Sequence, residues 1–492
     1  MTENNENTQP KQYVTTTLPY VNADPHIGFA FEITQADAYA RFKRLTGHEG
    51  FFNMGADEHG EKIWRNAQAE GRDVQAYVDH YAKQFDKLKA KLNASYNNFI
   101  RTTDSDHKKA AQEFWRRCDD NGDIYKKEYE GLYCVGCEMF VTEKDLDANG
   151  RCPDHPDRKP EAISEENYFF RFSHYEDALL SLYEDQPDFV VPDRRFNEIK
   201  QFVQDGLEDF SISRKKDKLP WGVPVPGDDD QGMYVWFDAL VNYISTLGWP
   251  ENQKQFTEFW RQGNPVQFAG KDQIRQQAAM WQAMLMSAGL PNTNQIFLHG
   301  FINVDGQKMS KSIGNVVNPY DLVDEFGTDV VRYYLLRHIH PDEDSNFTLD
   351  KLTEAYNGSL ANGLGNTVSR IASMYSSYDV DVAFDQEAAM QDEDLEILTE
   401  HMNNFRFDQA MDYIWQEVSH LDAFITDREP YKGIKSDDED DVREAKEAVA
   451  YLALRLFDIA EMLKPFMPET SEEIQDILKE GRDPEPLFER KE

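Results

Sequence analysis

The hydrophobic pattern of residues 13–54 constrains the fold most strongly, because it changes from the period of a strand to that of a helix and back. Residues 13–17 form a β-branched run typical of a buried strand, and a turn-rich stretch follows at 19–25. Helical spacing then extends to Gly47, and residues 51–54 begin another apolar run. The apolar positions at helical spacing are Phe29, Ile33, Ala36 and Ala40. Strand, helix and strand in this order predict an α/β domain with a parallel sheet.

The middle of the chain interrupts this pattern. Residues 118–226 contain all four cysteines and many short, turn-rich pieces, which we interpret as an insertion. The α/β pattern returns from Gly232, and after about residue 360 two long apolar faces predict a helical region. The further predicted elements are strands at 234–236, 266–269 and 296–298, a helix at 274–287, and helices over 407–425 and 448–463.

Composition limits the location and the partners. The chain has 492 residues, with 52 Lys and Arg against 91 Asp and Glu, a net charge of −39. It has no run of 18 apolar residues, so we expect no membrane partner, and residues 1–10 lack the features of a secretory signal. Four cysteines fit a reducing, cytoplasmic location. The acidity disfavours nucleic acids unless cations gather locally, and adaptation to a salty cytoplasm would also produce it.

Two short motifs have the residue types of a phosphate site. Residues 26–29, His-Ile-Gly-Phe, lie where the predicted helix begins, and a helix start presents free N–H groups to anions. A histidine there can add a hydrogen bond, although this motif alone also fits a turn or capping histidine. Residues 308–312, Lys-Met-Ser-Lys-Ser, suit a loop whose ammonium groups stabilise a charged leaving group. The alternative for the second motif is a solvated basic loop.

Together these motifs resemble the HIGH and KMSKS signatures of class I aminoacyl-tRNA synthetases. Further stretches are similar to the methionyl-tRNA synthetase family, and the resemblance runs from about residue 12 to 478. It implies activation of methionine with ATP to methionyl-adenylate, followed by transfer of the methionyl group to the 3′ end of methionine tRNA. The similar stretches are residues 17–22, 55–60, 234–239 and 270–272 and the helical C-terminal third.

The resemblance also implies an architecture. It is a Rossmann-like parallel-sheet catalytic domain, split by a zinc-knuckle insertion and followed by an α-helical bundle that binds the anticodon. Because the chain ends soon after that bundle, we expect a monomer. The expected segments are a disordered tail at 1–11, the two catalytic halves at 12–117 and 229–303, the inserted connective domain at 118–228, the KMSKS loop and linking segment at 304–358, and the anticodon-binding domain at 359–492.

Individual roles follow from the same resemblance. His26, Lys308 and Lys311 would be catalytic and would act on the triphosphate of ATP, which arrives with Mg²⁺. Asp57 would hold the ammonium group of methionine, and Arg214 matches a further active-site position. The implied ATP-binding residues are His26, Gly28, Gly270, Asp272, Lys308, Ser310 and Lys311. The implied methionine-binding residues are Leu18, Tyr20, Asp57, Trp236, Ala239, Tyr243, Gln277 and Trp281. Taken singly, the tryptophans also fit a core and Asp57 a turn.

The chain departs from the family pattern at three positions. Phe29 replaces the last histidine of the HIGH motif, Gln277 stands where many methionine enzymes have a histidine, and Leu240 replaces a common proline. Glutamine still donates a hydrogen bond, so we expect altered contacts rather than lost activity. One alternative is a catalytically impaired, tRNA-binding paralogue. Another is a different class I synthetase, but about 110 inserted residues are too few for the editing insertion of the leucine, isoleucine and valine enzymes.

The cysteine spacing predicts a structural metal. Cys134 and Cys137 are separated by two residues, and so are Cys152 and His155. Two such hairpins can close a tetrahedral Cys3His zinc site, and the family's insertion carries a similar knuckle. A second metal site at Asp57, Glu58 and His59 is an alternative to the methionine site, but it lacks clear further ligands nearby. The remaining Cys118 is predicted to lie in the core.

The helical third contains candidate base readers. Asn366 and Arg370 are four residues apart and therefore share one helix face. They match family positions that read the anticodon, and Pro430-Tyr431 matches a Pro-Trp in many relatives. Tyrosine can still stack on an unpaired base. The alternative is an ordinary helix surface.

Overall fold

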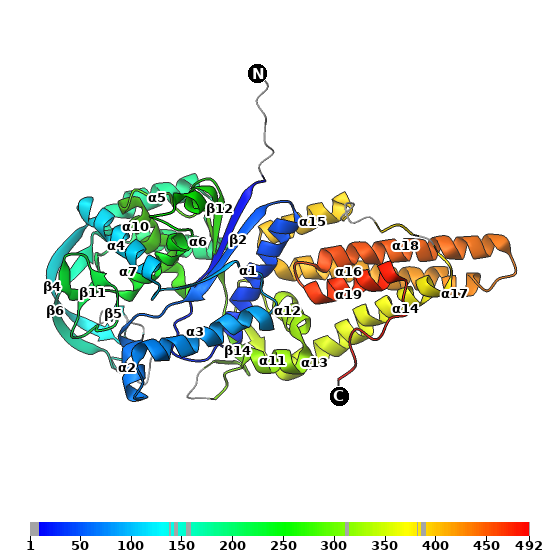
Figure 1. The fold of residues 1–492 in the computed structure, drawn as a ribbon, viewed down its shortest axis with the longest axis horizontal. Coiled ribbons are helices and arrows are strands. Elements are labelled where there is room, and N and C mark those ends of the chain that lie inside the picture. Colours follow the sequence, from blue (N-terminus) through cyan, green and yellow to red (C-terminus); the bar gives the residue numbers. More distant parts are fainter. Residues whose placement is uncertain are drawn as a thin grey trace, which may run out of the picture. The chain divides into compact units, whose positions relative to one another are not determined.

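The computed structural model divides into two compact units (Figure 1). Unit 1 comprises Met1–Pro25, Gly47–Lys89 and Ser95–His299, and unit 2 comprises His26–Thr46, Ala90–Ala94 and Gly300–Glu492. The described residues are 9–136, 139–141, 146–153, 159–309, 314–380, 382–384 and 390–491. Among the helices in these ranges, none has the length and apolar character needed to span a membrane.

Unit 1 is built around a six-stranded sheet in which all neighbouring strands are parallel. The strand order is β3-β2-β1-β12-β13-β7, so the connections diverge in opposite directions from the β1–β12 pair. In such sheets ligands bind at the carboxyl ends of the strands near this switch point. The predicted α/β class and parallel sheet are confirmed. The bounds are β1 Lys11–Thr16, β2 Glu49–Ala56, β3 Asn98–Arg101, β7 Val190–Val191, β12 Asn264–Gly270 and β13 Gln295–His299.

A large apolar core lies beside this sheet. It joins Tyr13, Val190 and Ile296 of the strands to the buried faces of several helices. Cys118 belongs to this core, as predicted, and burial raises the pKa of its thiol to about 12. The helices are α4 Ser105–Asp120, α5 Glu176–Asp185, α6 Asp193–Gln204 and α10 Trp281–Ser287, with a π-helical turn at Gln276–Met280 before α10.

The region predicted as an insertion forms smaller sheets but is not fully separate. Its strands make an antiparallel sheet of order β5-β4-β6-β8, and β10-β11-β9 form another. However, β7 lies in the same region and is the outermost strand of the main sheet, where it pairs with β13. The bounds are β4 Ile124–Cys134, β5 Met139–Val141, β6 Glu161–Phe170, β8 Phe210–Ser211, β9 Ser213–Lys215, β10 Pro224–Val225 and β11 Asp228–Met233.

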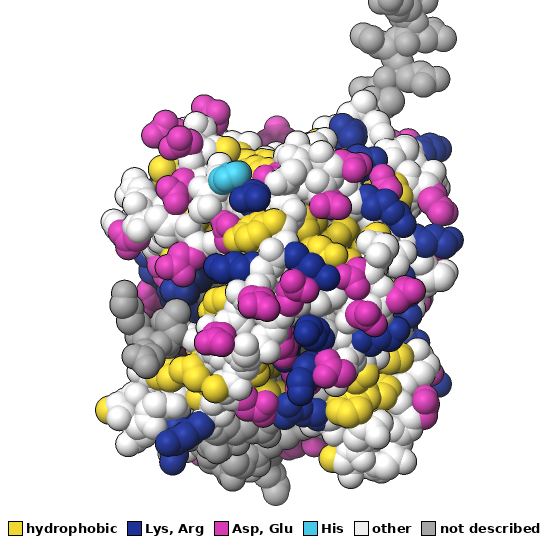
Figure 2. All heavy atoms as spheres, turned by 90° about the vertical axis from the view of Figure 1, so that its left-hand side faces the viewer, with side chains coloured by type: hydrophobic (Ala, Val, Ile, Leu, Met, Phe, Trp, Pro, Cys, Tyr) yellow, Lys and Arg dark blue, Asp and Glu magenta, His cyan; other side chains and the backbone are white. Residues whose placement is uncertain are grey.

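The acidic excess is not a uniform coating on the face of unit 1 in Figure 2. Lys and Arg side chains are mixed there with Asp and Glu and with apolar side chains. Ion pairs account for part of this mixture in unit 1. Lys126 Nζ lies 2.8 Å from Asp228 Oδ2, and Arg65 Nη1 lies 3.1 Å from Glu161 Oε1. Exposed pairs of this kind contribute little to stability.

The predicted strand at residues 234–236 is wrong. Strand β11 ends at Met233, and Tyr234 caps helix α7, Val235–Ala239. Aromatic and β-branched residues favour strands only weakly, and tertiary contacts override that preference here. Phe237 packs against the rings of Phe114 and Trp115, at centroid distances of 5.7 and 5.2 Å. The helical turn places the next residue, Asp238, against buried histidines.

Unit 2 is mainly helical, which confirms the helical C-terminal region. Helices α14, α16, α18 and α19 lie side by side (Figure 1), and a small sheet of order β15-β14-β16 precedes them. The strand bounds are β14 Ile302–Val304, β15 Gln307–Lys308 and β16 Ser345–Phe347. The helix bounds are α11 Pro319–Phe326, α12 Thr328–Arg337, α13 Leu349–Ala355, α14 Gly365–Ser377, α15 Asp392–Asn403, α16 Phe407–Arg428, α17 Pro430–Gly433, α18 Glu439–Leu463 and α19 Pro468–Glu480.

Helix α1, Ile27–Leu45, groups with unit 2 although it precedes β2 in the chain. Its Tyr39 ring stacks on Phe405 at 5.2 Å, and its Gln35 donates to the carbonyl of Pro341 at 3.1 Å. Its Asp37 forms a buried ion pair with Arg332 of α12. The helix that begins directly after His26 is therefore held by contacts with C-terminal residues of unit 2.

Candidate active site

The candidate residues of unit 1 follow three neighbouring strands at their carboxyl ends. Leu18 and Tyr20 follow β1, Asp57 follows β2, and Gly270 ends β12. The first two segments pair directly, because the Asp57 N–H donates to the Pro19 carbonyl at 2.9 Å and the Asp57 carbonyl accepts from Val21 at 3.1 Å. The structure thus brings Leu18, Tyr20 and Asp57 together beside the strand switch point.

Residues 58–61, which follow Asp57, are held by several charged contacts. Glu58 is buried, which raises the pKa of its carboxyl, and it accepts from Arg101 Nε at 2.5 Å and Nη2 at 3.0 Å. Trp221 Nε1 donates to the Glu58 carbonyl at 2.6 Å, and the Gly60 N–H donates to the Trp221 carbonyl at 3.1 Å. Because Glu58 already binds Arg101, these contacts do not favour the alternative metal site.

Arg214 also belongs to these contacts. Its Nη1 donates to Glu61 Oε2 at 2.9 Å, and its Nη2 donates to Glu165 Oε1 at 2.9 Å. The guanidinium is buried and lies 4.1 Å from the centre of the Tyr133 ring. These donors are engaged with two carboxylates, so the geometry favours a role in holding Glu61 over direct contact with a ligand.

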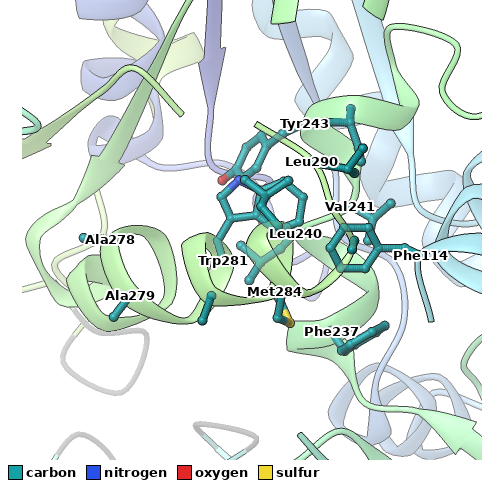
Figure 3. Close-up of a cluster of buried hydrophobic side chains, with 14 of the residues drawn as sticks. Phe114, Phe237, Leu240, Val241, Tyr243, Ala278, Ala279, Trp281, Met284 and Leu290 are labelled. Carbon is teal, nitrogen blue, oxygen red and sulfur yellow. The ribbon is translucent and has the colours of Figure 1, made fainter. Parts of the chain in front are cut away.

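The aromatic candidates fall into two clusters. Trp281 is fully buried with Tyr243 in the main core (Figure 3), with ring centroids 5.8 Å apart. Trp236 instead packs on a small cluster of Tyr133, Val135 and Tyr234. The two tryptophans therefore do not share one cluster. Ala239 is at the end of α7, which begins beside the small cluster, and it is also buried.

Gln277 and Asp272 each make a close contact that positions the side chain. Gln277 is buried, and its Oε1 accepts from Gln267 Nε2 at 3.3 Å, which leaves the amide nitrogen as its donor end. Asp272 lies in a single turn after β12, and a Cβ on Gly270 would meet its Oδ1 at 2.8 Å. Gly270 therefore lets this carboxylate approach the strand end closely.

The two motifs of unit 2 meet at the start of α1. His26 caps the helix, because its Nδ1 accepts from the Gly28 N–H at 3.1 Å. A neutral ring then carries its proton on Nε2, which makes that atom a donor. A Cβ on Gly28 would lie 2.9 Å from His26 Cε1 and 3.6 Å from Cε of Met309. A side chain at residue 28 would therefore displace the capping His26 ring, and the residue after Lys308 lies beside the helix start.

Other features of these motifs are consistent with a phosphate site. The Phe29 ring packs on His26 at a centroid distance of 4.3 Å, so the departure from the family pattern supports the histidine rather than displacing it. Lys308 ends β15, and its Nζ lies 5.4 Å from the centre of the Phe301 ring. Ser310 and Lys311 lie outside the described residues.

The predicted zinc ligands are described only in part. Cys134 ends β4 and Cys152 lies farther along the chain, and both side chains are buried. Buried thiols fit a structural zinc site. Cys137 and His155 lie outside the described residues.

The predicted anticodon residues lie on the helices of unit 2. Asn366 is exposed on α14, and Arg370 Nη1 on the same helix donates to Asp422 Oδ1 of α16 at 2.5 Å. Pro430 is buried at the start of α17, and the neighbouring Tyr431 is 38% exposed, so its ring is accessible for stacking. Asn366 borders a pocket of about 390 Å³ whose other lining residues are Ala361, Asn362, Gly365, Ser369, Pro486, Leu487 and Phe488.

Sequence reasoning missed two buried residues beside the candidate methionine site. Asp238 and His107 are almost fully buried and bond to each other. One signal was available for Asp238, which is a charged residue within the apolar run 233–241. A buried charge requires a partner. No spacing rule pointed to His107, which is 131 residues away in the chain.

Comparison with known proteins gives consistent results at three levels. The family model described as tRNA synthetases class I (M) matches residues 12–159 and 154–372. Methionine–tRNA ligase of Thermotoga maritima is 40% identical over 479 residues, covering 94% of this chain and 74% of that protein. Methionine–tRNA ligase of Thermosynechococcus vestitus is 41% identical over 477 residues, covering 94% of this chain and 89% of that protein.

Solved structures agree with this assignment. The Mycobacterium tuberculosis methionyl-tRNA synthetase in complex with methionyl-adenylate superposes with a TM-score of 0.89 at 36% identity. The match covers 95% of this chain and 94% of that one. The apo form of the same enzyme gives a TM-score of 0.84 at 32% identity, covering 99% of both chains.

Proposed function

Because this chain belongs to the family of class I tRNA synthetases (M), we propose that it is a methionine–tRNA ligase. It activates methionine with ATP and charges methionine tRNA. The observation that carries this proposal beyond similarity is the meeting of two motifs: Met309, next to Lys308, lies beside Gly28 at the capped start of α1. A helix start with a histidine donor and a nearby ammonium group suits a polyphosphate.

The reaction has two steps. A carboxylate oxygen of methionine attacks the α-phosphorus of ATP, the bond to the β-phosphate oxygen breaks, and pyrophosphate leaves. A ribose hydroxyl at the 3′ end of tRNA then attacks the carbonyl carbon of methionyl-adenylate, and AMP leaves. Such displacements depend mainly on positioning and charge stabilisation.

The residues that bind the phosphate groups of ATP are His26, Gly28, Lys308, Ser310 and Lys311. The Nε2 donor of His26 and the N–H groups of the first turn of α1 bind phosphate oxygens, and the two lysines stabilise charge on the departing pyrophosphate. Mg²⁺ enters with ATP and screens the phosphate charges when bound.

Unit 1 supplies the residues for methionine and the ribose. Asp57 binds the methionine ammonium group, and the Asp272 carboxylate beside Gly270 accepts hydrogen bonds from ribose hydroxyls. Leu18, Tyr20, Trp236, Ala239, Tyr243, Gln277 and Trp281 complete the methionine site. Aromatic walls suit a polarizable thioether. Arg214 acts through Glu61 and holds the segment that follows Asp57.

Amino-acid-dependent exchange between ATP and pyrophosphate tests the first step. We expect exchange with methionine and not with the other protein amino acids. Lys308→Ala should lower the exchange rate by about 100-fold or more without lowering the melting temperature, since one stabilising donor is lost. Lys351→Ala, an exposed lysine of α13, is the matched control and should leave the rate unchanged. Absence of exchange on folded protein would instead favour the tRNA-binding paralogue.

The proposal includes a structural zinc in a knuckle formed by Cys134, Cys137, Cys152 and His155. The burial of Cys134 and Cys152 supports it. Metal analysis should find about one zinc ion per chain, which Cys134→Ser abolishes and Cys118→Ser retains. Full zinc content in the Cys134 variant would refute this ligand set.

The remaining parts of the proposal concern the recognition of tRNA and the oligomeric state, location and domain boundaries of the protein. Asn366, Arg370, Pro430 and Tyr431 on the helical bundle read the anticodon, supported by the exposure of Asn366 and Tyr431. A monomer in the cytoplasm and the domain boundaries given above belong to the same proposal. Charging of a methionine tRNA with a changed anticodon tests the reading, since Arg370→Ala should reduce the preference for the native anticodon. Arg443→Ala should not.

A further inference from the structure

Asp238 fastens three separate segments of unit 1 within the protein interior. Its Oδ2 lies 2.8 Å from His59 Nδ1, and its Oδ1 lies 3.0 Å from His107 Nε2. The second histidine also bonds to Ser245 Oγ, at 2.9 Å from Nδ1. Asp238 is fully buried and both histidines are nearly so. Desolvating a carboxylate is costly unless it is hydrogen bonded, so these bonds hold the three segments in one arrangement.

Both ends of the His59–Asp238 bond are adjacent to proposed methionine contacts. His59 is two residues after Asp57, which binds the ammonium group in the proposed function. Asp238 lies between Trp236 and Ala239, which contact the side chain. The bond therefore joins the segment that binds one end of the amino acid to the helix that binds the other end.

The other described contacts of residues 58–61 lead elsewhere. Glu58 is tied to Arg101 of β3, Glu61 to Arg214 of β9, and the backbone to Trp221. These contacts hold residues 58–61 against β3, β9 and Trp221. The His59–Asp238 bond connects it to α7 and so sets the spacing between the two parts of the pocket.

Helix α7 depends on such tertiary contacts. It has five residues, which is too short for internal hydrogen bonds alone to hold it. The Phe237 side chain contacts Phe114 and Trp115 (Figure 3 shows Phe114 and Phe237), and the preceding Tyr234 N–H donates to the Ile212 carbonyl at 2.8 Å. Apolar packing positions one face, and the Asp238 carboxylate fixes the rotation that presents Trp236 and Ala239.

We propose that Asp238 is a positioning residue of the methionine pocket, which acts through His59 and is itself held by His107. It sets the distance between the Asp57 carboxylate and the wall formed by Trp236 and Ala239. The inference rests on the proposed function, because it assumes that these residues contact methionine. A pocket of defined length selects methionine over homologues that differ by one carbon, such as homocysteine and ethionine.

Steady-state ATP–pyrophosphate exchange with Asp238→Asn tests the inference. The amide keeps the shape but loses the charge that two imidazoles bind, so we expect the KM for methionine to rise about tenfold or more. The KM for ATP should stay within about twofold, and the preference for methionine over homocysteine and ethionine should fall. A merely structural role would not separate the two substrates.

A matched control distinguishes this effect from general loosening. Asp123 is also a buried carboxylate of unit 1, bonded by Tyr175 Oη at 2.6 Å and Ser287 Oγ at 2.7 Å. Asp123→Asn should leave the KM for methionine unchanged. Equal effects of both variants, or an equal rise in the KM for ATP in Asp238→Asn, would overturn the inference.

A second pair of variants applies if Asp238→Asn does not fold. His107→Leu removes a bond to Asp238 and should raise the KM for methionine, whereas His107→Gln retains a donor and should restore it in part. No difference between Leu and Gln would overturn the inference. Failure of the wild-type protein to exchange with methionine would instead contradict the proposed function, which keeps the two failures apart.

Discussion

Two buried carboxylates, Asp238 in unit 1 and Asp37 in unit 2, are equally shielded from water but have different partners. Asp238 binds two imidazoles. Asp37 Oδ2 binds two guanidinium groups, Arg41 Nε at 2.8 Å and Arg332 Nη1 at 2.7 Å. Both carboxylates link segments that are distant in the sequence, yet only the partners of Asp238 flank a proposed substrate site.

The partners determine what each cluster does. Arginine stays charged at every pH at which proteins fold, and the other donors of Arg332 reach the carbonyls of Leu92, Pro465 and Phe466 at 2.8–3.0 Å. Arg332 therefore clamps α1 to the turn between α18 and α19. The Asp238 carboxylate instead binds two imidazoles and holds a short helix rather than a bundle. We therefore expect the Asp37 cluster to stabilise the fold and the Asp238 cluster to adjust the proposed methionine pocket.

The largest expected effect is at the Arg332 clamp. Arg332→Met should lower the free energy of unfolding by about 3–5 kcal/mol, because it removes one of the two guanidinium groups that bind the buried Asp37 carboxylate and also the donors to the carbonyls of Leu92, Pro465 and Phe466. Urea denaturation of the variant and the wild type measures this difference. Arg443→Met, which removes an exposed pair with Asp440, is the control and should cost less than about 1 kcal/mol. Similar losses in both variants would show that Arg332 is not a clamp.

A smaller effect on stability is expected for Asp238 at acidic pH. The bonds from its two histidines outweigh burial and lower the pKa of this carboxyl from 3.8 to about 2. A carboxyl with a depressed pKa stabilises the fold above its unfolded value, and this stability is lost as the pH falls from about 4 toward 2. The difference in the free energy of unfolding between the wild type and Asp238→Asn should therefore decrease by about 2 kcal/mol over this range. Denaturation at several pH values checks this; a gap that widens in acid would contradict it.

A still smaller effect should come from the second partner of Asp37. Arg41 is partly exposed, and it also donates to the Asn93 carbonyl at 2.5 Å. Arg41→Gln should cost about 1 kcal/mol, since Arg332 remains bonded to Asp37. Urea denaturation beside Arg332→Met ranks the two. An equal loss in both variants would assign the clamp to the pair of arginines.

The smallest effect concerns Cys118, which reports whether the core of unit 1 stays closed. Burial raises the pKa of its thiol to about 12, so the reactive thiolate is almost absent at neutral pH. Alkylation of the native protein should leave Cys118 unmodified, as peptide mass analysis would show. Rapid modification under native conditions would mean that the core of unit 1 opens. The Asp238 cluster could then not be treated as shielded from water to the same degree as the Asp37 cluster.

Local patterns predicted much of the fold. Apolar spacing identified α1, α16 and α18, and apolar runs identified β1, β2, β12 and β13, because these signals depend on near neighbours. Two features of the fold were not predicted correctly. The two-residue strand β7 is too short to show a pattern, and at residues 234–236 tertiary packing overrode the strand preference.

The candidate site shows the same division. His26, Gly28 and Lys308 were found from motifs, and the structure adds how closely the His26 ring approaches Gly28 and how Phe29 supports the histidine. The bonds of Asp238 could not be predicted, because they join residues more than 100 positions apart. Similarly, Arg214 was assigned to the active site by resemblance, whereas only the structure shows its bonds to Glu61 and Glu165.

Charging of tRNA is the most direct test of whether the protein is a methionine–tRNA ligase. Purified protein, MgATP and labelled methionine would be incubated with a methionine tRNA transcript and with the same transcript carrying a different anticodon. We expect the label to enter the acid-precipitable fraction with the methionine tRNA, to depend on ATP, and to be strongly reduced with the changed anticodon. No labelled tRNA from protein that is folded and contains zinc would contradict the assignment as a methionine–tRNA ligase.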